Sequence, residues 1–283
     1  MSHDQASRLR SLALRTLRPA PASHSVSART IVVSSGERRL GGTTLAVHLS
    51  TSLARQGQRV VLVDADLETA GASLLCRVHL APGLTDVLTE RRNIHEVLQR
   101  GPAGIQILAG SQTATERTLL TDKSAERLMR QLAGLSRHTD VVVLDVPCQE
   151  AEPRGESLLH SPLLSFWQRA DDLVLVTSGD DSAVMNTYAL LKSCWSRTVV
   201  LPRLHVVVNH ARDQAIAIDV HERLDRSSRR FLKLPLTLAG SLPTSPTAAS
   251  TTGVSDDAFD SALEQIAQRL LSSSVSNEIR TVA

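Results

Sequence analysis

One segment near residue 35 has the residue types of a phosphate-binding loop. The β-branched run Thr30–Ser34 leads into a loop with several glycines, and Thr43 and Thr44 then open a helical pattern. In such an arrangement the loop N–H groups and the helix N-terminus point at phosphate oxygens. A lysine adds a positive charge at the β- and γ-phosphates, and a Ser or Thr hydroxyl binds Mg²⁺. The segment therefore predicts either nucleotide chemistry or an ordinary strand-to-helix turn without a ligand.

The segments that must position this loop are short apolar runs separated by helical patterns. The predicted strands are Thr30–Ser34, Arg59–Val63, Gly104–Leu108, Asp140–Leu144, Asp172–Thr177, Leu204–Val208 and Leu236–Ala239. The clearest predicted helices are Thr44–Gln56, Ser182–Ser196 and Phe259–Leu271. Runs that are apolar at successive positions indicate strands buried on both faces. We therefore predict an α/β fold with a doubly wound, mostly parallel sheet flanked by helices, and a ligand site beyond the carboxyl ends of its strands.

Composition argues against several other classes of protein. The formal net charge of the 283 residues is +2 and aromatic residues make up 2%, which fits neither a nucleic-acid coat nor a protein that stacks single strands. The three cysteines, Cys76, Cys148 and Cys194, form no CxxC pair, so neither a disulfide framework nor a structural zinc site is indicated. No apolar run approaches the ~20 residues that span a bilayer. We therefore expect a cytoplasmic protein.

The chain divides into four parts by composition. Residues 1–18 combine an apolar helical stripe with arginines, and residues 19–28 are rich in Pro, Ala and Ser, as linkers are. The strand and helix patterns occupy residues 29–272, and residues 273–283 form a polar tail. The first part has three interpretations: a helix that docks on a partner, a basic amphipathic helix on a membrane surface, or an organellar transit peptide.

The loop near residue 35 resembles the deviant Walker A loop of the MinD/ParA family, whose pattern is SGKGGVGKTTLAVNLA. The shared positions are Ser35, Gly36, Gly41, Thr43, Thr44, Leu45, Ala46 and Val47. Glu37 stands in place of the signature lysine, Arg38 and Arg39 in place of two glycines, and Gly42 in place of the Walker lysine. The resemblance implies a MinD-like P-loop NTPase fold, and the family's cofactors are ATP and Mg²⁺.

Later segments resemble the same family in the same order. VLVDADL is similar to the switch segment, which implies that Asp64 and Asp66 lie near Mg²⁺ and the attacking water. VVVLDVP resembles the Walker B strand and includes Asp145, with Val146 where the family has Thr or Ser. In VVVNH, Asn209 stands where the family contacts adenine, and LAGSLPTSP resembles the segment beside the base.

The resemblance defines a candidate ATP site. Its cofactor-binding residues would be Gly36, Gly41, Gly42, Thr43, Thr44, Asp145 and Asn209. The Mg²⁺ ligands would be Thr43, Asp64 and Asp145, and the catalytic residues would be Asp66, which positions water, and Asp64. In a ligand-free interpretation, the aspartates cap the turns that follow their strands, and the threonines cap the helix.

The departures from the pattern predict that ATP binding and hydrolysis are impaired. Gly42 removes a cation from the phosphates, and Glu37 brings an anion to them. Arg38 and Arg39 replace glycines that permit close backbone approach, although their guanidinium groups could still bind phosphate. Because the family's signature lysine reaches across a dimer to the partner's nucleotide, Glu37 also predicts that ATP does not drive homodimer formation. The alternative is a working ATPase switch that binds ATP and dimerises.

Two further segments resemble the FlhG/FleN subfamily of flagellar-number regulators. Asp180–Lys192 is similar to its EPTAITDAYALIK segment. The subfamily's N-terminal DQAxxLR motif is matched by Asp4, Gln5, Ala6, Leu9 and Arg10. There the motif stimulates the flagellar GTPase FlhF, so the resemblance implies FlhF and flagellar assembly proteins as partners. It implies a regulator of flagellar number or placement, at the inner face of the plasma membrane near flagellar sites. The alternative is another MinD-like regulator, of cellulose secretion or partition.

Contacts with nucleic acid or membrane have weaker support in the sequence. The basic residues of Arg212–Lys233 are interleaved with acidic ones, as on a solvated helix face. The amphipathic stretch AFDSALEQIAQRLL fits the last helix of the fold, and the tail after it has little apolar area to anchor in a membrane. We therefore expect no nucleic-acid partner and only weak or transient membrane contact.

Overall fold

The computed structural model describes residues 28–113, 118–148, 163–195, 202–245 and 256–272. The predicted docking helix of residues 1–18, its motif residues, the linker up to residue 27 and the tail of residues 273–283 lie outside the described residues. The motif residues concerned are Asp4, Gln5, Ala6, Leu9 and Arg10. The N-terminal helix therefore stays a prediction.

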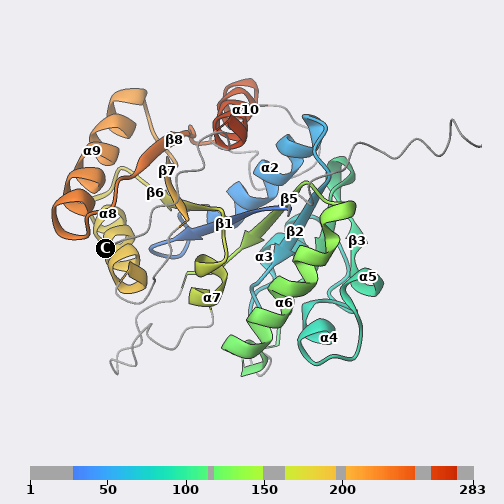
Figure 1. Cartoon of the computed structure of the whole chain (residues 1–283). Helices are drawn as coiled ribbons and strands as arrows, with labels where there is room; N and C mark the ends of the chain where they lie inside the picture. The colour runs from blue at the N-terminus through green and yellow to red at the C-terminus, as the bar shows by residue number, and fades with distance from the viewer. Residues whose placement is uncertain (1–27, 114–117, 149–162, 196–201, 246–255, 273–283) are drawn as a thin grey trace, which may run out of the picture.

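An eight-stranded sheet runs through the middle of the molecule in the order β3-β4-β2-β5-β1-β6-β7-β8 (Figure 1). The strands are β1 (Arg29–Ser35), β2 (Val60–Asp64), β3 (Gln99–Arg100), β4 (Gln106–Leu108), β5 (Val141–Asp145), β6 (Asp172–Thr177), β7 (Arg203–Val208) and β8 (Thr237–Ser241). All neighbours pair in parallel except β3 and β4 at one edge, which are antiparallel. The prediction of a mostly parallel, doubly wound sheet is confirmed.

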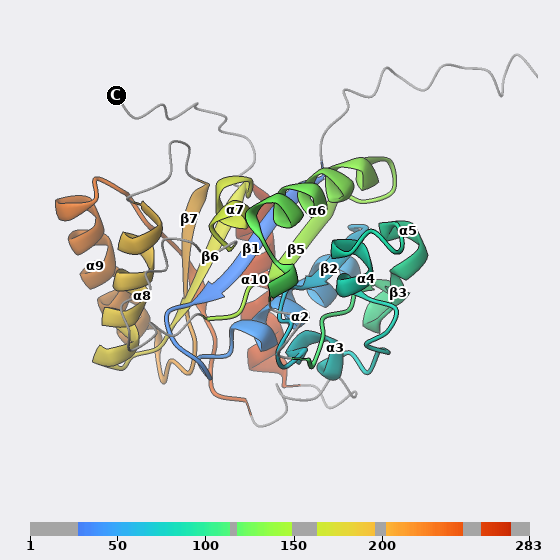
Figure 2. The ribbon, with the colours of Figure 1, turned by 90° about the horizontal axis from the view of Figure 1, so that it is seen from below.

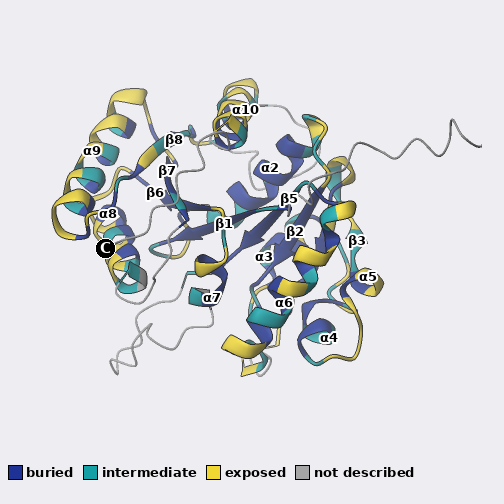
Figure 3. Ribbon diagram, viewed as in Figure 1, coloured by how far each residue is buried: buried dark blue, intermediate teal, exposed yellow. Residues whose placement is uncertain are grey.

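Helices cover both faces of this sheet (Figure 2). They are α2 (Gly42–Arg55), α3 (Gly71–Leu75), α4 (Leu84–Leu88), α5 (Ile94–Val97), α6 (Asp122–Gly134), α7 (Leu163–Gln168), α8 (Asp181–Trp195), α9 (Gln214–Phe231) and α10 (Asp257–Ser272), with 3₁₀ turns η1 (Pro102–Gly104) and η3 (Leu135–Arg137). Side chains of α2, α3 and α10 form one buried core with the sheet, and those of α4 to α9 form a second. The strands between them are dark in the burial view of Figure 3 because both of their faces are covered.

All seven predicted strands are found, with ends that differ by at most two residues. The strand predicted to begin at Gly104 begins at Gln106, since Gly104 belongs to the turn η1 and has φ +82°. Edge strand β3 was missed because Gln99 and Arg100 form a two-residue polar strand without an apolar run. The sequence therefore predicted the strands that build the core and missed the one that does not.

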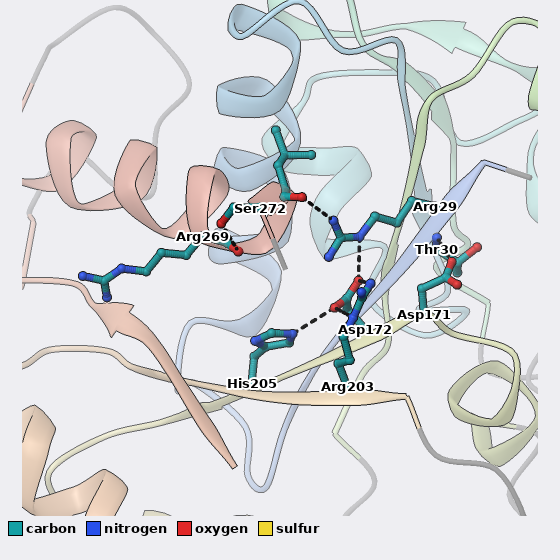
Figure 4. A network of polar contacts seen from close by, with 9 residues as sticks. Arg29, Thr30, Asp171, Asp172, Arg203, His205, Arg269 and Ser272 are labelled. Carbon is teal, nitrogen blue, oxygen red and sulfur yellow. Dashed lines mark hydrogen bonds and ion pairs between the residues drawn. The ribbon is translucent and has the colours of Figure 1, made fainter. Parts of the chain in front are cut away.

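A polar network closes the amino end of the sheet (Figure 4). The carboxylate of Asp172, at the start of β6, is fully buried and accepts hydrogen bonds from Arg29 Nε at 2.7 Å and His205 Nε2 at 2.9 Å. Arg203 donates to both carboxylate oxygens, each at 2.9 Å. Arg29 also donates to the carbonyl of Leu271 at 3.1 Å, so the network joins β1, β6 and β7 to the end of α10.

Candidate functional site

The candidate site lies at the carboxyl edge of the sheet, where β1, β5 and β2 lie side by side. The register pairs Asp64, the last residue of β2, with Asp145, the last residue of β5, and pairs Asp145 with Val33 of β1. From β1 the chain runs to one half of the sheet, and from β5 it crosses to β6 on the other side of β1. This reversal of strand order is where open α/β sheets bind ligands.

The loop after β1 is packed closely against the start of α8. A Cβ on Gly36 would lie 2.4 Å from the backbone nitrogen of Thr187 and 2.5 Å from the carbonyl carbon of Asn186, so no larger residue fits there. Arg39 and Gly41 adopt left-handed backbone conformations, with φ of 66° and 86°. This conformation is unstrained in glycine and uncommon in arginine, so the loop keeps a glycine backbone geometry with an arginine at position 39.

Helix α2 begins at Gly42, and its N-cap residue is Gly41. Thr43 and Thr44 therefore lie within the first turn, and the interpretation of these threonines as the helix cap is wrong. The N-terminus of α2 has no side-chain cap and no acidic residue in its first turn. Its first N–H groups remain available to an anion, as in phosphate-binding helices.

Several groups of the loop contact other segments of the chain. Glu37 accepts a hydrogen bond from Asn186 Nδ2 at 2.6 Å, which ties the loop to α8. Arg38 reaches Glu68 at 3.4 Å, and both side chains are largely exposed, so this pair contributes little stability. The loop carbonyl of Leu40 accepts a hydrogen bond from Asn209 Nδ2 at 2.9 Å.

Asn209 is thus placed beside the loop, as its candidate role requires, although its amide is engaged there. Its side chain is buried, and a Cβ on Gly41 would lie 2.2 Å from its Nδ2 atom. Its Oδ1 atom accepts from the backbone N–H of His210 at 3.0 Å. In this structure the amide therefore holds the loop closed.

The three predicted aspartates lie near one another and make different contacts. Asp64 accepts from the N–H and the hydroxyl of Ser73, at 2.8 and 2.7 Å, and from the N–H of Asp66 at 3.2 Å. Asp66 accepts hydrogen bonds from the backbone N–H of Glu68 at 2.8 Å and from the backbone N–H of Thr69 at 2.9 Å. Asp145 accepts from the hydroxyl of Thr43. Asp66 therefore caps its turn, as the ligand-free interpretation has it, while Thr43 and Asp145 meet as a Mg²⁺ site would require.

Burial makes this edge of the sheet unfavourable for negative charge. Loss of solvation raises the pKa of Asp64 to about 6. The hydrogen bonds from Ser73 act in the opposite sense and lower this pKa, but they do not outweigh burial. Burial likewise raises the pKa of Asp145 well above its ordinary value, and the neighbouring charge of Asp64 adds to the effect. Two carboxylates in adjacent register thus share a site without a counter-ion among the described side chains, which is the electrostatic setting that a cation relieves.

A groove of about 720 Å³ lies between the loops after β6 and β7, lined among others by Gly179, Asp180, His210, Arg212 and Thr244. None of the predicted site residues lines it. In the part of the chain that the structure describes, no group of three or more His, Cys, Asp or Glu is placed to hold a metal ion, and no helix is long and apolar enough to cross a bilayer.

Comparison with known proteins agrees with this architecture. Residues 28–160 match the family model of an AAA domain. The chain is 28% identical over 215 residues to the antiactivator FleN of Pseudomonas aeruginosa, covering 76% of this chain and 73% of FleN. The chain is thus similar to ATPases of the MinD/ParA type. Among these matches, the similarity to FleN supports a likeness to the FleN/FlhG group.

Solved structures of the superfamily have the same fold. The cell division ATPase MinD of Pyrococcus furiosus superimposes with a TM-score of 0.67 at 20% identity, covering 87% of this chain and 99% of MinD. The septum site-determining protein MinD of Pyrococcus horikoshii, solved with Mg-ADP, gives 0.67 at 19% identity over 86% of this chain and 96% of MinD. At these identities the likeness shows the fold alone.

The superfamily's Mg-nucleotide therefore has to be tested against the residues of this chain. The uncapped α2 N-terminus and the Thr43–Asp145 contact suit a phosphate and its cation. The loop itself fits poorly, because position 42 has no side chain and Glu37 is an anion held in place by Asn186. The contact of Thr43 with Asp145 is thus compatible with a cation, whereas the loop has no lysine at position 37 or position 42.

Neutralising one buried carboxylate should stabilise the protein. A folded-state pKa above the unfolded value of about 3.9 means that the native state binds the proton more tightly, so this stability is present at low pH and is lost as pH rises through the folded pKa. We expect Asp145→Asn to raise the free energy of unfolding at pH 7, with the gain shrinking as pH falls toward the unfolded pKa of about 3.9. Urea unfolding across that range measures it.

The matched control is Asp181→Asn on α8, whose side chain is 80% exposed and pairs with Arg223 rather than with the buried aspartates. It should change the free energy of unfolding by less than about 0.5 kcal/mol at any of these pH values. A loss of stability in Asp145→Asn at pH 7 would contradict the assignment of Asp145 as a buried, destabilising charge.

Several residues that shape the site were not predicted from the sequence. Ser73 bridges two segments, since its hydroxyl donates to Asp64 and accepts from the N–H of Gly110 at 2.9 Å. Asn186 holds Glu37, 149 residues away in the chain. Neither has a local signal, because each pairing depends on strands and helices being brought together by the fold. The glycines were the available hint, since Gly110 and Gly36 mark close backbone approaches.

Proposed function

We propose that this chain regulates flagellar assembly, its number or its placement, through protein contacts rather than through ATP turnover. The similarity to FleN over 215 residues supports the regulatory class. The segment Asp180–Lys192, which resembles the FlhG/FleN subfamily, forms the first twelve residues of α8 and the residue before it. Since α8 is the helix against which the degenerate loop packs, the subfamily resemblance and the altered loop belong to one surface of the molecule.

The observation that carries the proposal is the chemistry of positions 37 and 42. A P-loop binds a triphosphate by surrounding it with N–H groups and at least one lysine. Here Glu37 is fixed by Asn186 and Gly42 offers no charge, so ATP binding and hydrolysis are weak and no catalytic step is assigned to Asp64 or Asp66. The same glutamate removes the lysine that would reach a second nucleotide, so ATP does not drive dimer formation.

The proposed partner surface includes residues 1–18, which precede the described structure. By resemblance to the subfamily, Asp4, Gln5, Ala6, Leu9 and Arg10 contact the flagellar GTPase FlhF. The linker of residues 19–28 would let this segment reach its partner while the folded body docks elsewhere. A cytoplasmic location, near the inner face of the plasma membrane at flagellar sites, follows from that partner.

Substitutions in the N-terminal segment should separate binding from stimulation. We expect full-length Gln5→Ala to lower the stimulated GTPase rate of FlhF more than its affinity, because a glutamine at a GTPase site can orient the attacking water. Leu9→Asp should abolish binding, since it places a charge on the apolar stripe. GTP hydrolysis by FlhF and a direct binding titration measure the two effects.

Ser11→Ala, outside the motif, is the matched control and should leave both quantities unchanged. If deletion of residues 1–18 changes neither the GTPase rate nor the number of flagella per cell, the motif match is fortuitous. The membrane-surface interpretation of the segment, or a role as another MinD-like regulator, then takes its place. Measured ATP turnover would instead support the alternative of a working ATPase switch.

A further inference from the structure

The C-terminal end of α9 carries an aromatic side chain that the fold leaves uncovered. The buried residues of this helix are Ala217, Val220, Leu224 and Ser228, at spacings of three and four. Phe231 follows at the next such spacing, where the pattern predicts burial, but it is 65% exposed. The other two phenylalanines, Phe166 and Phe259, are buried. In Figure 3 the outer side of α9 accordingly includes yellow, exposed segments.

This exposed ring is not at a frayed end. The next residue, Leu232, is buried, as is Leu234, and both anchor the turn that leads to β8. Ser228 donates its hydroxyl to the carbonyl of Leu234 at 2.8 Å, which fixes the turn against the helix. The tip therefore presents Phe231 to solvent from a rigid support.

Positive charge surrounds the ring. From Asp225 to Lys233 the chain has four cations, namely Arg226, Arg229, Arg230 and Lys233, against one carboxylate. That carboxylate is already engaged, since Asp225 accepts from Arg229 Nε at 2.6 Å and from the N–H of Leu236 at 2.7 Å. The guanidinium of Arg230 lies 5.2 Å from the centre of the Phe231 ring. Within the described residues, Arg226 and Arg230 make no ion pair.

The fold separates charges that the sequence interleaves. Nearer the start of α9, Asp219 pairs with Arg223, which also reaches Asp181 of α8, and Glu222 is exposed. The far end of the helix is left with a net positive charge around an apolar centre. The solvated helix face predicted for this region describes the first half of α9 and not its tip.

We propose that the tip of α9, formed by Arg226, Arg229, Arg230, Phe231 and Lys233, binds an anionic phospholipid surface. An apolar side chain that enters the headgroup region, ringed by cations that attract acidic lipids, is the arrangement of interfacial membrane anchors. Duplex nucleic acid would call for cations along a track and has no use for the apolar ring. The assignment stands apart from the proposed partner and from ATP, since it uses none of their residues.

The position of the tip suits this role. Helix α9 returns from the carboxyl end of β7 to the amino end of β8, so its tip lies at the amino end of the sheet, opposite the degenerate loop. Docking there would leave the loop and the start of α8 accessible.

Co-flotation of the full-length chain with vesicles tests the assignment. Vesicles of equal parts phosphatidylglycerol and phosphatidylcholine should bind the protein, and vesicles of phosphatidylcholine alone should not. We expect Phe231→Ser, and separately the double variant Arg226→Gln with Arg230→Gln, to lower the bound-to-free ratio by roughly tenfold or more. The control Met185→Ser removes another exposed apolar side chain, 70% exposed on α8, and should bind as the unaltered chain does.

Each other result overturns the proposal. The first is that the unaltered chain does not bind the anionic vesicles. The second is that Phe231→Ser and Met185→Ser lower the bound-to-free ratio equally. The third is that the arginine variant lowers this ratio and Phe231→Ser does not. The last pattern, with binding to duplex DNA measured by fluorescence anisotropy, would identify a polyanion site instead. Light scattering tests whether a second copy of the chain covers the tip of α9 instead. In that case the mass of the unaltered chain would double as its concentration rises, and the mass of Phe231→Ser would not. Circular dichroism melting shows that each variant is folded.

Discussion

A lysine at position 42 is expected to raise the ATP affinity of this chain by roughly ten- to a hundredfold. A charge-assisted contact to phosphate contributes about 1.5–3 kcal/mol, and each 1.4 kcal/mol changes a dissociation constant tenfold. The backbone at position 42 accepts a Cβ, which would lie 3.5 Å from Ser35 Oγ and 3.7 Å from Ser35 Cβ, ordinary contact distances. Calorimetric titration of Gly42→Lys with ATP and Mg²⁺, beside the unaltered chain, measures the gain.

A second substitution should add to the first. Glu37→Lys removes the anion and costs only a partly exposed hydrogen bond to Asn186. We expect the double variant to bind more tightly than Gly42→Lys by a further severalfold, since a repulsive charge is replaced by an attractive one. The matched control is Gly134→Lys at the end of α6, where a Cβ has open space and the added charge is remote from the loop. It should leave the affinity unchanged.

The opposite results are equally clear. Micromolar ATP binding by the unaltered chain, with Mg²⁺-dependent hydrolysis that Asp66→Ala abolishes, would show a working ATPase. Binding that is lost in Arg38→Ala with Arg39→Ala would show that these arginines replace the missing lysines. Light scattering with and without ATP tests the associated claim on assembly, and a nucleotide-dependent doubling of mass would count against it.

The part of the site that depends on local sequence could be predicted. The β-branched run before Gly36 and the helical pattern after Thr44 locate the loop, and apolar runs that end in Asp64 and Asp145 place both carboxylates at the same edge of a parallel sheet. These predictions succeed because hydrophobic periodicity decides which residues form strands, and parallel strands end together. The residue types in the loop then indicate its chemistry without coordinates.

The rest of the site depends on contacts between distant segments. The sequence around Glu37 does not predict its hydrogen bond from Asn186. The sequence around Leu40 likewise does not predict that Asn209 donates to its carbonyl. The threonines after Gly41 could have been the helix cap until the dihedral angles placed the cap at Gly41 itself. For Phe231 the local pattern gives the wrong answer. Helical spacing predicts that this side chain is buried, but it lies at the end of the folded body and is exposed. Such outcomes are set by tertiary packing, on which local patterns are silent.

Functional and structural aspartates in this fold can be told apart by what surrounds them. Asp64 and Asp145 are buried beside each other with too few donors, so burial raises their pKa values. Asp172 is equally buried at the opposite end of the sheet. Burial would raise its pKa too, but hydrogen bonds from His205, Arg29 and Arg203 outweigh burial and hold the pKa of Asp172 well below its usual range. One end of the sheet thus has carboxylates that destabilise it, and the other has a carboxylate that joins it together.

We therefore expect Asp172→Ala to cost about 3–5 kcal/mol of the free energy of unfolding at pH 7, because it leaves the largely buried guanidinium of Arg29 without its ion pair and the ring of His205 without its hydrogen bond. Arg29 and His205 are 12% and 5% exposed, while Arg203, at 35%, can reach water, which favours the lower part of that range. Since the folded-state pKa is depressed, the stabilisation is present above the unfolded value of about 3.9 and is lost as pH falls toward the folded one. The difference between the two proteins should therefore be constant from pH 5 upward and shrink below pH 4.

The adjacent residue supplies the control. Asp171 is exposed and accepts one hydrogen bond, from the N–H of Thr30 at 2.8 Å, so Asp171→Ala should cost only about 1 kcal/mol. Urea unfolding of both variants between pH 3 and pH 8 makes the comparison. A cost for Asp172→Ala no larger than that of Asp171→Ala would mean that Arg29, Arg203 and His205 are solvated or paired without it. The junction of β1, β6 and β7 with α10 would then be held by apolar packing alone.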